Sequence, residues 1–176
     1  IYPDAYRKAL IPTAQFLGTE PQNIAFVTNA TSGVATVLQS LRLKEEDELI
    51  CTNHRYQAVY NSMAYQGRLR GARIIECRLD SIAPSAAEIC EALEQKISRK
   101  TRLIIMDAIS SITAHEFELS PIIDLAKAHQ IPIMVDGAHS PGQHLQKLHS
   151  RLFRPLFLDI TIEHMIYVCL SDLQQF

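Results

Sequence analysis

The chain has 176 residues, of which 47% are hydrophobic, and this combination is typical of one globular domain with a sizeable core. Its 19 acidic and 17 basic side chains are scattered along the sequence, so no basic stripe predicts binding to nucleic acid. No apolar stretch approaches the roughly 20 residues that span a bilayer. We therefore expect neither nucleic acid nor a membrane among its partners.

The first half of the chain alternates between helical and strand patterns. Apolar residues at helical spacing predict a helix over residues 6–16, which Gly18 would end. A strand over 24–28 leads into a helix capped by Thr31 or Asn29. Strands over 48–52 and 73–77 then flank a helix predicted over 54–70, which Gly71 would end.

The second half continues this alternation as far as Gln143. Ser85 opens a helix that is predicted to reach residue 97, and residues 101–106 read as a buried strand. Ser120 and Pro121 have the signature of a helix start, and residues 131–135 form a further strand. The whole pattern predicts an α/β fold, a three-layer α/β/α arrangement with a mostly parallel sheet.

The pattern fails after Gln143. Bulky apolar and basic residues then follow one another with neither the periodicity of a helix nor that of a strand. Residues 160–170 form an apolar run whose secondary structure the pattern does not assign. We therefore divide the chain into a domain over residues 6–143 and a divergent tail over 144–176.

The cysteines show no pattern that predicts a disulfide or a metal site. They are far apart, with no Cys-x-x-Cys pair and no histidine at zinc-like spacing, so we expect reduced thiols and neither a disulfide nor a metal centre. Reduced thiols favour a cytoplasmic location. The four residues are Cys51, Cys77, Cys90 and Cys169.

Two strand ends carry the groups most able to bind a phosphorylated ligand. Thr31, Ser32 and Gly33 stand where a helix begins, so their hydroxyls and N–H groups could hold a phosphate, although such residues also cap helices for structural reasons alone. Asp136 ends an apolar strand, where an open parallel sheet binds its ligands, and could accept a hydrogen bond from a protonated ring nitrogen. The alternative is a simple turn cap, which Gly137 favours equally.

Three further residues follow strands and could contact the same ligand. Tyr56 could stack on a flat ring, or merely pack with other tyrosines along a helix face. Ser111 offers a hydroxyl from the loop after the 101–106 strand, although loop solubility explains it equally well. His139 could donate a hydrogen bond to a ring hydroxyl or a substrate, against the ordinary alternative of a surface histidine.

Taken in order, four motifs resemble the class V aminotransferase family, and most closely its isopenicillin N epimerase-like branch. They are VTNATSGVATVL over 27–38, HRYQAV over 54–59, SSIT over 110–113 and VDGAHSPGQ over 135–143. The resemblance covers roughly residues 6–143 and implies the large domain of fold type I enzymes, with pyridoxal 5′-phosphate as cofactor and an amino acid as substrate. It also implies a homodimer.

The resemblance assigns roles residue by residue. Thr31 and Ser32 match the phosphate binders, Tyr56 the residue stacked on the ring, and Asp136 the partner of the ring nitrogen. His139 matches the neighbour of the ring hydroxyl. Family members use a lysine that holds the cofactor as a Schiff base, carried by a His-Lys pair after one further strand.

This chain departs from the family at that lysine. Lys147 is the only lysine after Asp136, and it comes too early to match. We also expect the family's N-terminal segment and C-terminal half to be missing. The sequence therefore predicts a fragment of an epimerase or C–S lyase type enzyme that is inactive as this chain. The alternative is a non-catalytic remnant with weak cofactor or partner binding, and a nucleotide-binding module ranks last because no glycine-rich phosphate motif follows any strand.

Overall fold

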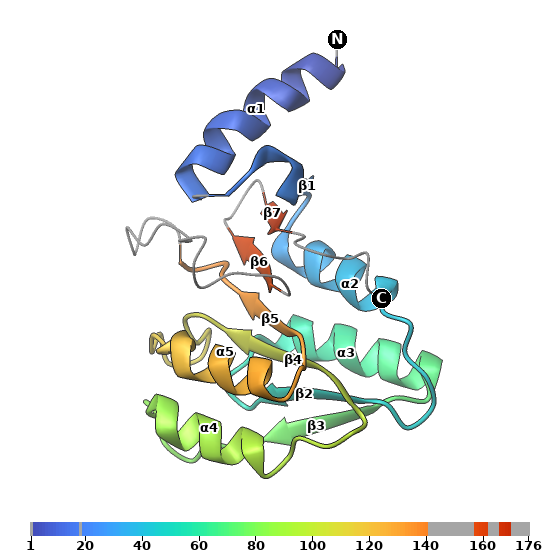
Figure 1. The fold of residues 1–176 in the computed structure, drawn as a ribbon, viewed down its shortest axis with the longest axis vertical. Helices are drawn as coiled ribbons and strands as arrows, with labels where there is room; N and C mark the ends of the chain where they lie inside the picture. The colour runs from blue at the N-terminus through green and yellow to red at the C-terminus, as the bar shows by residue number, and fades with distance from the viewer. Residues whose placement is uncertain (1, 18, 141–156, 162–165, 170–176) are drawn as a thin grey trace.

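A computed structural model describes residues 2–17, 19–140, 157–161 and 166–169 of the chain. Figure 1 shows one sheet with helices on both faces and a separate N-terminal helix. The strands are β1 (Ile24–Val27), β2 (Glu48–Thr52), β3 (Arg73–Cys77), β4 (Thr101–Asp107), β5 (Ile133–Asp136), β6 (Phe157–Thr161) and β7 (Ile166–Cys169). The helices are α1 (Tyr2–Leu17), the short 3-10 helix η1 (Pro21–Asn23), α2 (Ala30–Ser40), α3 (Gln57–Arg70), α4 (Ala86–Glu94) and α5 (Leu119–Ala128).

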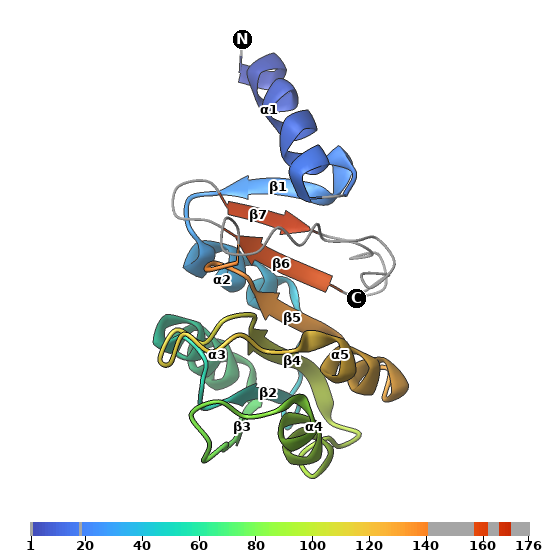
Figure 2. The same cartoon turned by 90° about the vertical axis from the view of Figure 1, so that its left-hand side faces the viewer.

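The described strands pair in the order β1-β7-β6-β5-β4-β2-β3. Every neighbouring pair from β3 to β6 is parallel, whereas β7 is antiparallel to both β6 and β1. It follows that β1 runs in the same direction as β6 and β5, as Figure 2 shows. The carboxyl ends of β1, β2, β4 and β5 therefore lie along one edge of the sheet, which we call the carboxyl edge.

Helices cover both faces of the sheet and form two separate apolar cores. Helices α2 and α3 pack on one face, where Val34, Leu38 and Met63 meet alternate residues of β2, β4 and β5. Helices α4 and α5 pack on the other face around Ile89 and Ile122. The predicted three-layer α/β/α fold with a mostly parallel sheet is thus confirmed, because strands buried on both faces need a helical layer on each.

Helix α1 stands apart from these layers (Figure 1). Its inner side packs against the start of β1 in a small cluster of Ala14, Leu17 and Ile24. The Tyr6 ring meets the Phe26 ring edge to face at 5.1 Å. Ile11 and Phe16, by contrast, are more than half exposed. Among the described residues, no helix combines the length and apolar character needed to cross a membrane.

Several element boundaries differ from those predicted. Helix α3 begins at Gln57 and not at residue 54, because Tyr56 is its extended N-cap residue. Helix α5 begins at Leu119 with Glu118 as N-cap, so Pro121 lies within the first turn, where its missing N–H costs nothing. Helix α4 ends at Glu94 and does not reach residue 97. Of the two caps proposed for α2, the structure has Asn29.

Strands β6 and β7 come from the segment that the sequence pattern predicted to be a divergent tail. β6 pairs with β5 from Ile133↔Phe157 to Asp136↔Ile160, and β7 closes the gap to β1. The division of the chain at residue 143 stays a prediction. Gly18, Gln143 and Lys147 lie outside the described residues.

Candidate functional site

All seven residues predicted to contact a cofactor follow a strand at the carboxyl edge. Thr31, Ser32 and Gly33 follow β1, and Tyr56 follows β2. The remaining three are Ser111 after β4, Asp136 at the end of β5, and His139 in the turn after it. Because these strands run in the same direction, the sheet topology brings together segments up to a hundred residues apart.

The N-terminus of α2 is the candidate phosphate site. Asn29 Oδ1 accepts a hydrogen bond from Ser32 N–H at 2.8 Å and another from the Ser32 hydroxyl at 2.9 Å. Gly33 N–H donates to the Asn29 carbonyl oxygen at 3.1 Å. In the described part of the chain, the N–H groups of Ala30 and Thr31 have no acceptor. These two N–H groups are free to donate hydrogen bonds to a ligand at the N-terminus of α2, and the helix dipole adds partial positive charge there.

Asp136 is a buried acid, 5% exposed, at the end of β5. Its Oδ1 accepts the Ala138 N–H at 3.0 Å, which is the turn cap that Gly137 suggested. Among the described residues, none donates a hydrogen bond to its other oxygen. Burial raises the pKa of the Asp136 carboxyl, while that hydrogen bond and the charge of His139 lower it. The carboxylate can therefore cap the turn and still accept a hydrogen bond from a cationic ligand.

The turn after β2, which presents Tyr56, is anchored at each of its four residues. Asn53 and Leu79 exchange two hydrogen bonds, at 2.8 and 3.0 Å. His54, 5% exposed, places Nε2 3.0 Å from the Ser81 carbonyl oxygen.

The next two residues of the turn are held as well. Arg55 forms an ion pair with Glu76 at 2.9 Å and lies 4.1 Å over the Tyr60 ring. Tyr56 donates its backbone N–H to Asp107 Oδ1 at 3.4 Å. Tyr56 itself is 49% exposed, and among the described residues its ring forms no aromatic contact with Tyr60 or Tyr65. A rigid turn thus holds an available aromatic ring at the carboxyl edge.

The loop after β4 is organised around Ser110. Its hydroxyl, 2% exposed, accepts hydrogen bonds from Ile112 N–H and Thr113 N–H at 3.3 and 3.2 Å. The same hydroxyl donates to the His54 carbonyl oxygen at 3.4 Å, which ties this loop to the turn after β2. Ser111 is exposed beside it, so its hydroxyl is accessible from solvent.

Asp107 is a residue of this edge that the sequence analysis missed. It ends β4 and pairs in register with Asp136 on β5. Burial raises the pKa of the Asp107 carboxyl to about 7, and the negative charge of Asp136 adds to the increase. The signal was available in the sequence, because a strand-end acid had already singled out Asp136, but the predicted strand stopped one residue short.

His139 is exposed in the turn that Ser140 N–H closes onto the Gly137 carbonyl oxygen at 2.8 Å. Its position next to Asp136 is consistent with either of the two interpretations drawn from the sequence. The role of His139, like those of the other six residues, stays a prediction.

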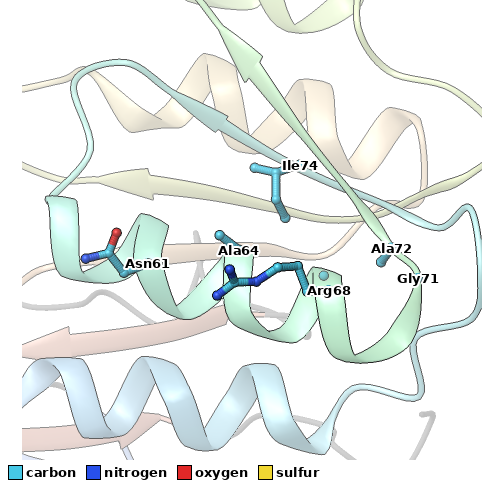
Figure 3. A pocket seen from close by; sticks show the side chains of 7 residues that line it. Asn61, Ala64, Arg68, Gly71, Ala72 and Ile74 are labelled. Carbon is cyan, nitrogen blue, oxygen red and sulfur yellow. The ribbon is translucent and has the colours of Figure 1, made fainter.

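A surface groove of about 580 Å³ lies elsewhere, between α3 and β3. Figure 3 shows Asn61 near one end of it and Gly71 near the other, with Ala64, Arg68 and Ile74 along α3 and β3. Its lining contains no acid and only one base, Arg68. None of the seven predicted residues lines this groove.

The described cysteines do not contribute to the site. Burial raises the pKa of the Cys51 thiol to about 12 and that of Cys77 to about 11, so both are neutral at physiological pH. Both pack in the apolar cores as small hydrophobic residues.

Comparison with known proteins supports the resemblance drawn from the four motifs. The family model described as Aminotransferase class-V matches residues 3–149. Isopenicillin N epimerase from Streptomyces clavuligerus is 30% identical over 129 residues, which is 73% of this chain and 32% of that protein. Hercynylcysteine sulfoxide lyase from Schizosaccharomyces pombe is 25% identical, covering 73% of this chain and 33% of that protein. The chain thus spans about a third of the length of these curated relatives.

Solved structures share the fold. The cysteine desulfurase CsdA from Escherichia coli superposes with a TM-score of 0.82 at 19% identity, covering 93% of this chain and 43% of that one. A mutant of the protein C-DES, with glycine covalently linked to its PLP cofactor, also reaches 0.82 at 20% identity, over 97% of this chain and 48% of that one. The resemblance drawn from the four motifs is confirmed: the chain belongs to the class V aminotransferase family.

Proposed function

We propose that this chain is the cofactor-binding part of a pyridoxal phosphate enzyme that acts on an amino acid, of the epimerase or C–S lyase and desulfurase type. One observation carries the proposal. In a chain of the class V family, the buried Asp136 and the uncapped N–H groups at the start of α2 lie on the same edge of one sheet. We further propose that the chain by itself does not turn over substrate.

The donors at the start of α2 suit the phosphate of this cofactor. Asn29 already satisfies Ser32 N–H, so the N–H groups of Ala30 and Thr31 and the Thr31 hydroxyl would hold the phosphate oxygens. The Ser32 hydroxyl accepts from Thr28 Oγ1 at 3.1 Å and donates to Asn29, so a phosphate would have to compete for it. A dianion at this end of the helix also gains from the helix dipole.

The environment of Asp136 suits the other end of the cofactor. A buried carboxylate whose pKa is raised by burial gains most from a cationic hydrogen-bond donor, and a protonated pyridine nitrogen is one. Asp136 would hold that proton on the ring. Tyr56 would stack on the ring, while Ser111 and His139 would meet its hydroxyl.

The bound cofactor would supply an electron sink that labilises the bonds at Cα of an amino acid. Asp136 supports that chemistry by keeping the ring nitrogen charged, since an unpaired cation in a buried site would lose its proton. The two curated relatives named above are by name an isopenicillin N epimerase and a hercynylcysteine sulfoxide lyase. We propose a reaction of one of these two types for this chain.

We propose that this chain is inactive because it has no lysine at the position of the family's Schiff-base lysine. The family lysine follows the strand after the β5 motif, and the sequence contains no lysine beyond β6. Lys147 precedes that strand. The same observation favours the second candidate function, a non-catalytic remnant that keeps only non-covalent cofactor binding.

Titration of the full chain with pyridoxal phosphate, followed by absorbance, tests the proposal. We expect reversible binding, no adduct after borohydride treatment, and no release of product from cysteine. Asp136→Ala should weaken binding at least tenfold, whereas Asp124→Ala, at an exposed position of α5, should not. Binding that is equal in the wild type and Asp136→Ala would overturn the assignment. A borohydride-fixed adduct with turnover would overturn the proposed inactivity.

Two properties of the family extend this proposal. A homodimer is proposed for the full-length enzyme, since the resemblance implies one. A cytoplasmic location is proposed because the described cysteines, Cys51, Cys77 and Cys90, are free thiols, as in reducing compartments.

A further inference from the structure

Asp107 occupies a place at the carboxyl edge for which the family resemblance supplied no role. Its side chain is almost fully buried, with 3% exposed, at the end of β4. Asp107 lies two residues after Ile105, and Asp136 two residues after Met134, both of which pack under α2 and α3. Because side chains alternate along a strand, both acids lie on that same face of the sheet.

The two oxygens of Asp107 bind two different segments. Oδ1 accepts the backbone N–H of Tyr56, in the turn after β2, at 3.4 Å. Oδ2 accepts the backbone N–H of Ser111, in the loop after β4, at 3.4 Å. One carboxylate thus bridges the two segments that present the predicted ring-stacking residue, Tyr56, and a second predicted cofactor contact, Ser111.

Keeping a carboxyl group at this place costs stability. It is buried beside a second acid, and its pKa of about 7 reflects both the burial and the neighbouring charge. A residue that served packing alone would be apolar here, because burying a charge without a cationic partner is unfavourable. The cost is offset if the two N–H groups must be held in a fixed geometry for a ligand.

We propose that Asp107 is a positioning residue that holds the Tyr56 turn and the Ser111 loop in the geometry that receives the cofactor. This inference rests on the proposed function. Asp107 itself would not contact the cofactor. It would act through the two backbone N–H groups, while Asp136 beside it binds the ring directly.

A matched control exists at the opposite edge of the sheet. Asp47 is also a buried acid, 5% exposed, and it accepts hydrogen bonds from Arg102 Nε and Lys44 N–H, both at 2.8 Å. It lies directly before β2, whereas Asp107 ends β4. Asp47→Asn therefore removes a buried charge and one of its two acceptor oxygens, as Asp107→Asn does, and leaves the carboxyl edge intact.

Amide hydrogen exchange of the full chain without cofactor tests the bridge. In Asp107→Ala, protection of Tyr56 N–H and Ser111 N–H should fall at least tenfold relative to the wild type. In Asp107→Asn, only one of these amides should lose protection, because the amide side chain keeps a single acceptor oxygen. Asp47→Asn should leave both amides unchanged. Wild-type exchange at both amides in the two Asp107 variants would overturn the bridge.

Titration with pyridoxal phosphate tests the consequence for binding. We expect affinity about tenfold weaker in Asp107→Asn and up to a hundredfold weaker in Asp107→Ala, with Asp47→Asn near the wild type. If Asp136→Ala weakens binding while both Asp107 variants bind like the wild type, the positioning role fails and the proposed function stands. If the wild type does not bind, the proposed function fails, and the exchange data still decide the bridge. The near-isosteric Asn variant keeps the test decisive should the Ala variant not fold.

Discussion

Asp107 and Asp136 are register partners on the adjacent parallel strands β4 and β5, and both carboxyl groups are buried. Neither has a basic side chain as an ion-pair partner among the described residues. Two acids placed in this way cannot both ionise without cost, because each loses hydration and each repels the charge of the other. Burial is the main cause of the raised pKa of both carboxyl groups, and the negative charge of Asp136 raises that of Asp107 further.

The stability of the fold should therefore depend on pH through Asp107. Its pKa is about 7 in the folded chain against an ordinary value of 3.8, so the folded state binds more protons between these values. Stability consequently falls as pH rises from about 4 to 7, by on the order of 4 kcal/mol at most. Asp107→Asn should lose the part of this dependence that Asp107 contributes and keep only the part that comes from Asp136. Urea unfolding of both proteins between pH 4 and 8 measures it, and parallel curves would contradict the prediction.

The cap of α2 should carry a measurable share of stability. Asn29→Ala removes the acceptor of Ser32 N–H and of the Ser32 hydroxyl, so the free energy of unfolding should fall by about 1 kcal/mol. Gln39→Ala, at an exposed position of the same helix, should change it by less than about 0.5 kcal/mol. Chemical denaturation of both variants compares them, and an equal effect would argue against the cap.

The pair between Asn53 and Leu79 should hold the Tyr56 turn in place. Asn53→Ala leaves the N–H and carbonyl groups of Leu79 without their partner, and we expect a loss of about 2 kcal/mol in stability. Asn61→Ala removes an exposed amide whose one side-chain hydrogen bond within the described residues is to Gln57, and it should be nearly neutral. Thermal unfolding distinguishes the two. A neutral Asn53→Ala would show that the turn does not depend on this pair.

Gly71 ends α3 with φ of 73°, a left-handed conformation that disfavours any Cβ. A Cβ at this position would also lie 3.2 Å from Glu45 Cγ. Gly71→Ala should therefore cost about 1–2 kcal/mol of stability. Gly71→Asn should cost less, because asparagine tolerates this conformation better. Denaturant titration measures both, and the reverse order of the two variants would contradict the backbone explanation.

Most of the fold was predictable because its signals are local. Gly71 was recognised as a helix stop and Ser85 as a helix start, and the structure has both, the latter as a complete capping box with Glu88. The alternation of buried strands and amphipathic helices predicted the three layers. Strands β6 and β7 were not recognised, since their place in the sheet depends on partners far away in the sequence and not on their own periodicity.

The sequence by itself determined the family and was sufficient to predict the residues of the candidate site, because motifs such as Asn29 to Gly33 and Asp136 to His139 carry their chemistry in consecutive positions. Only the tertiary structure decided which groups that are distant in the sequence lie close together in space. It placed Asp107 beside Asp136 and joined its two oxygens to Tyr56 and Ser111. Burial, like-charge repulsion and hydrogen bonds between loops arise from strand pairing across the sheet, and no local pattern of residues encodes them.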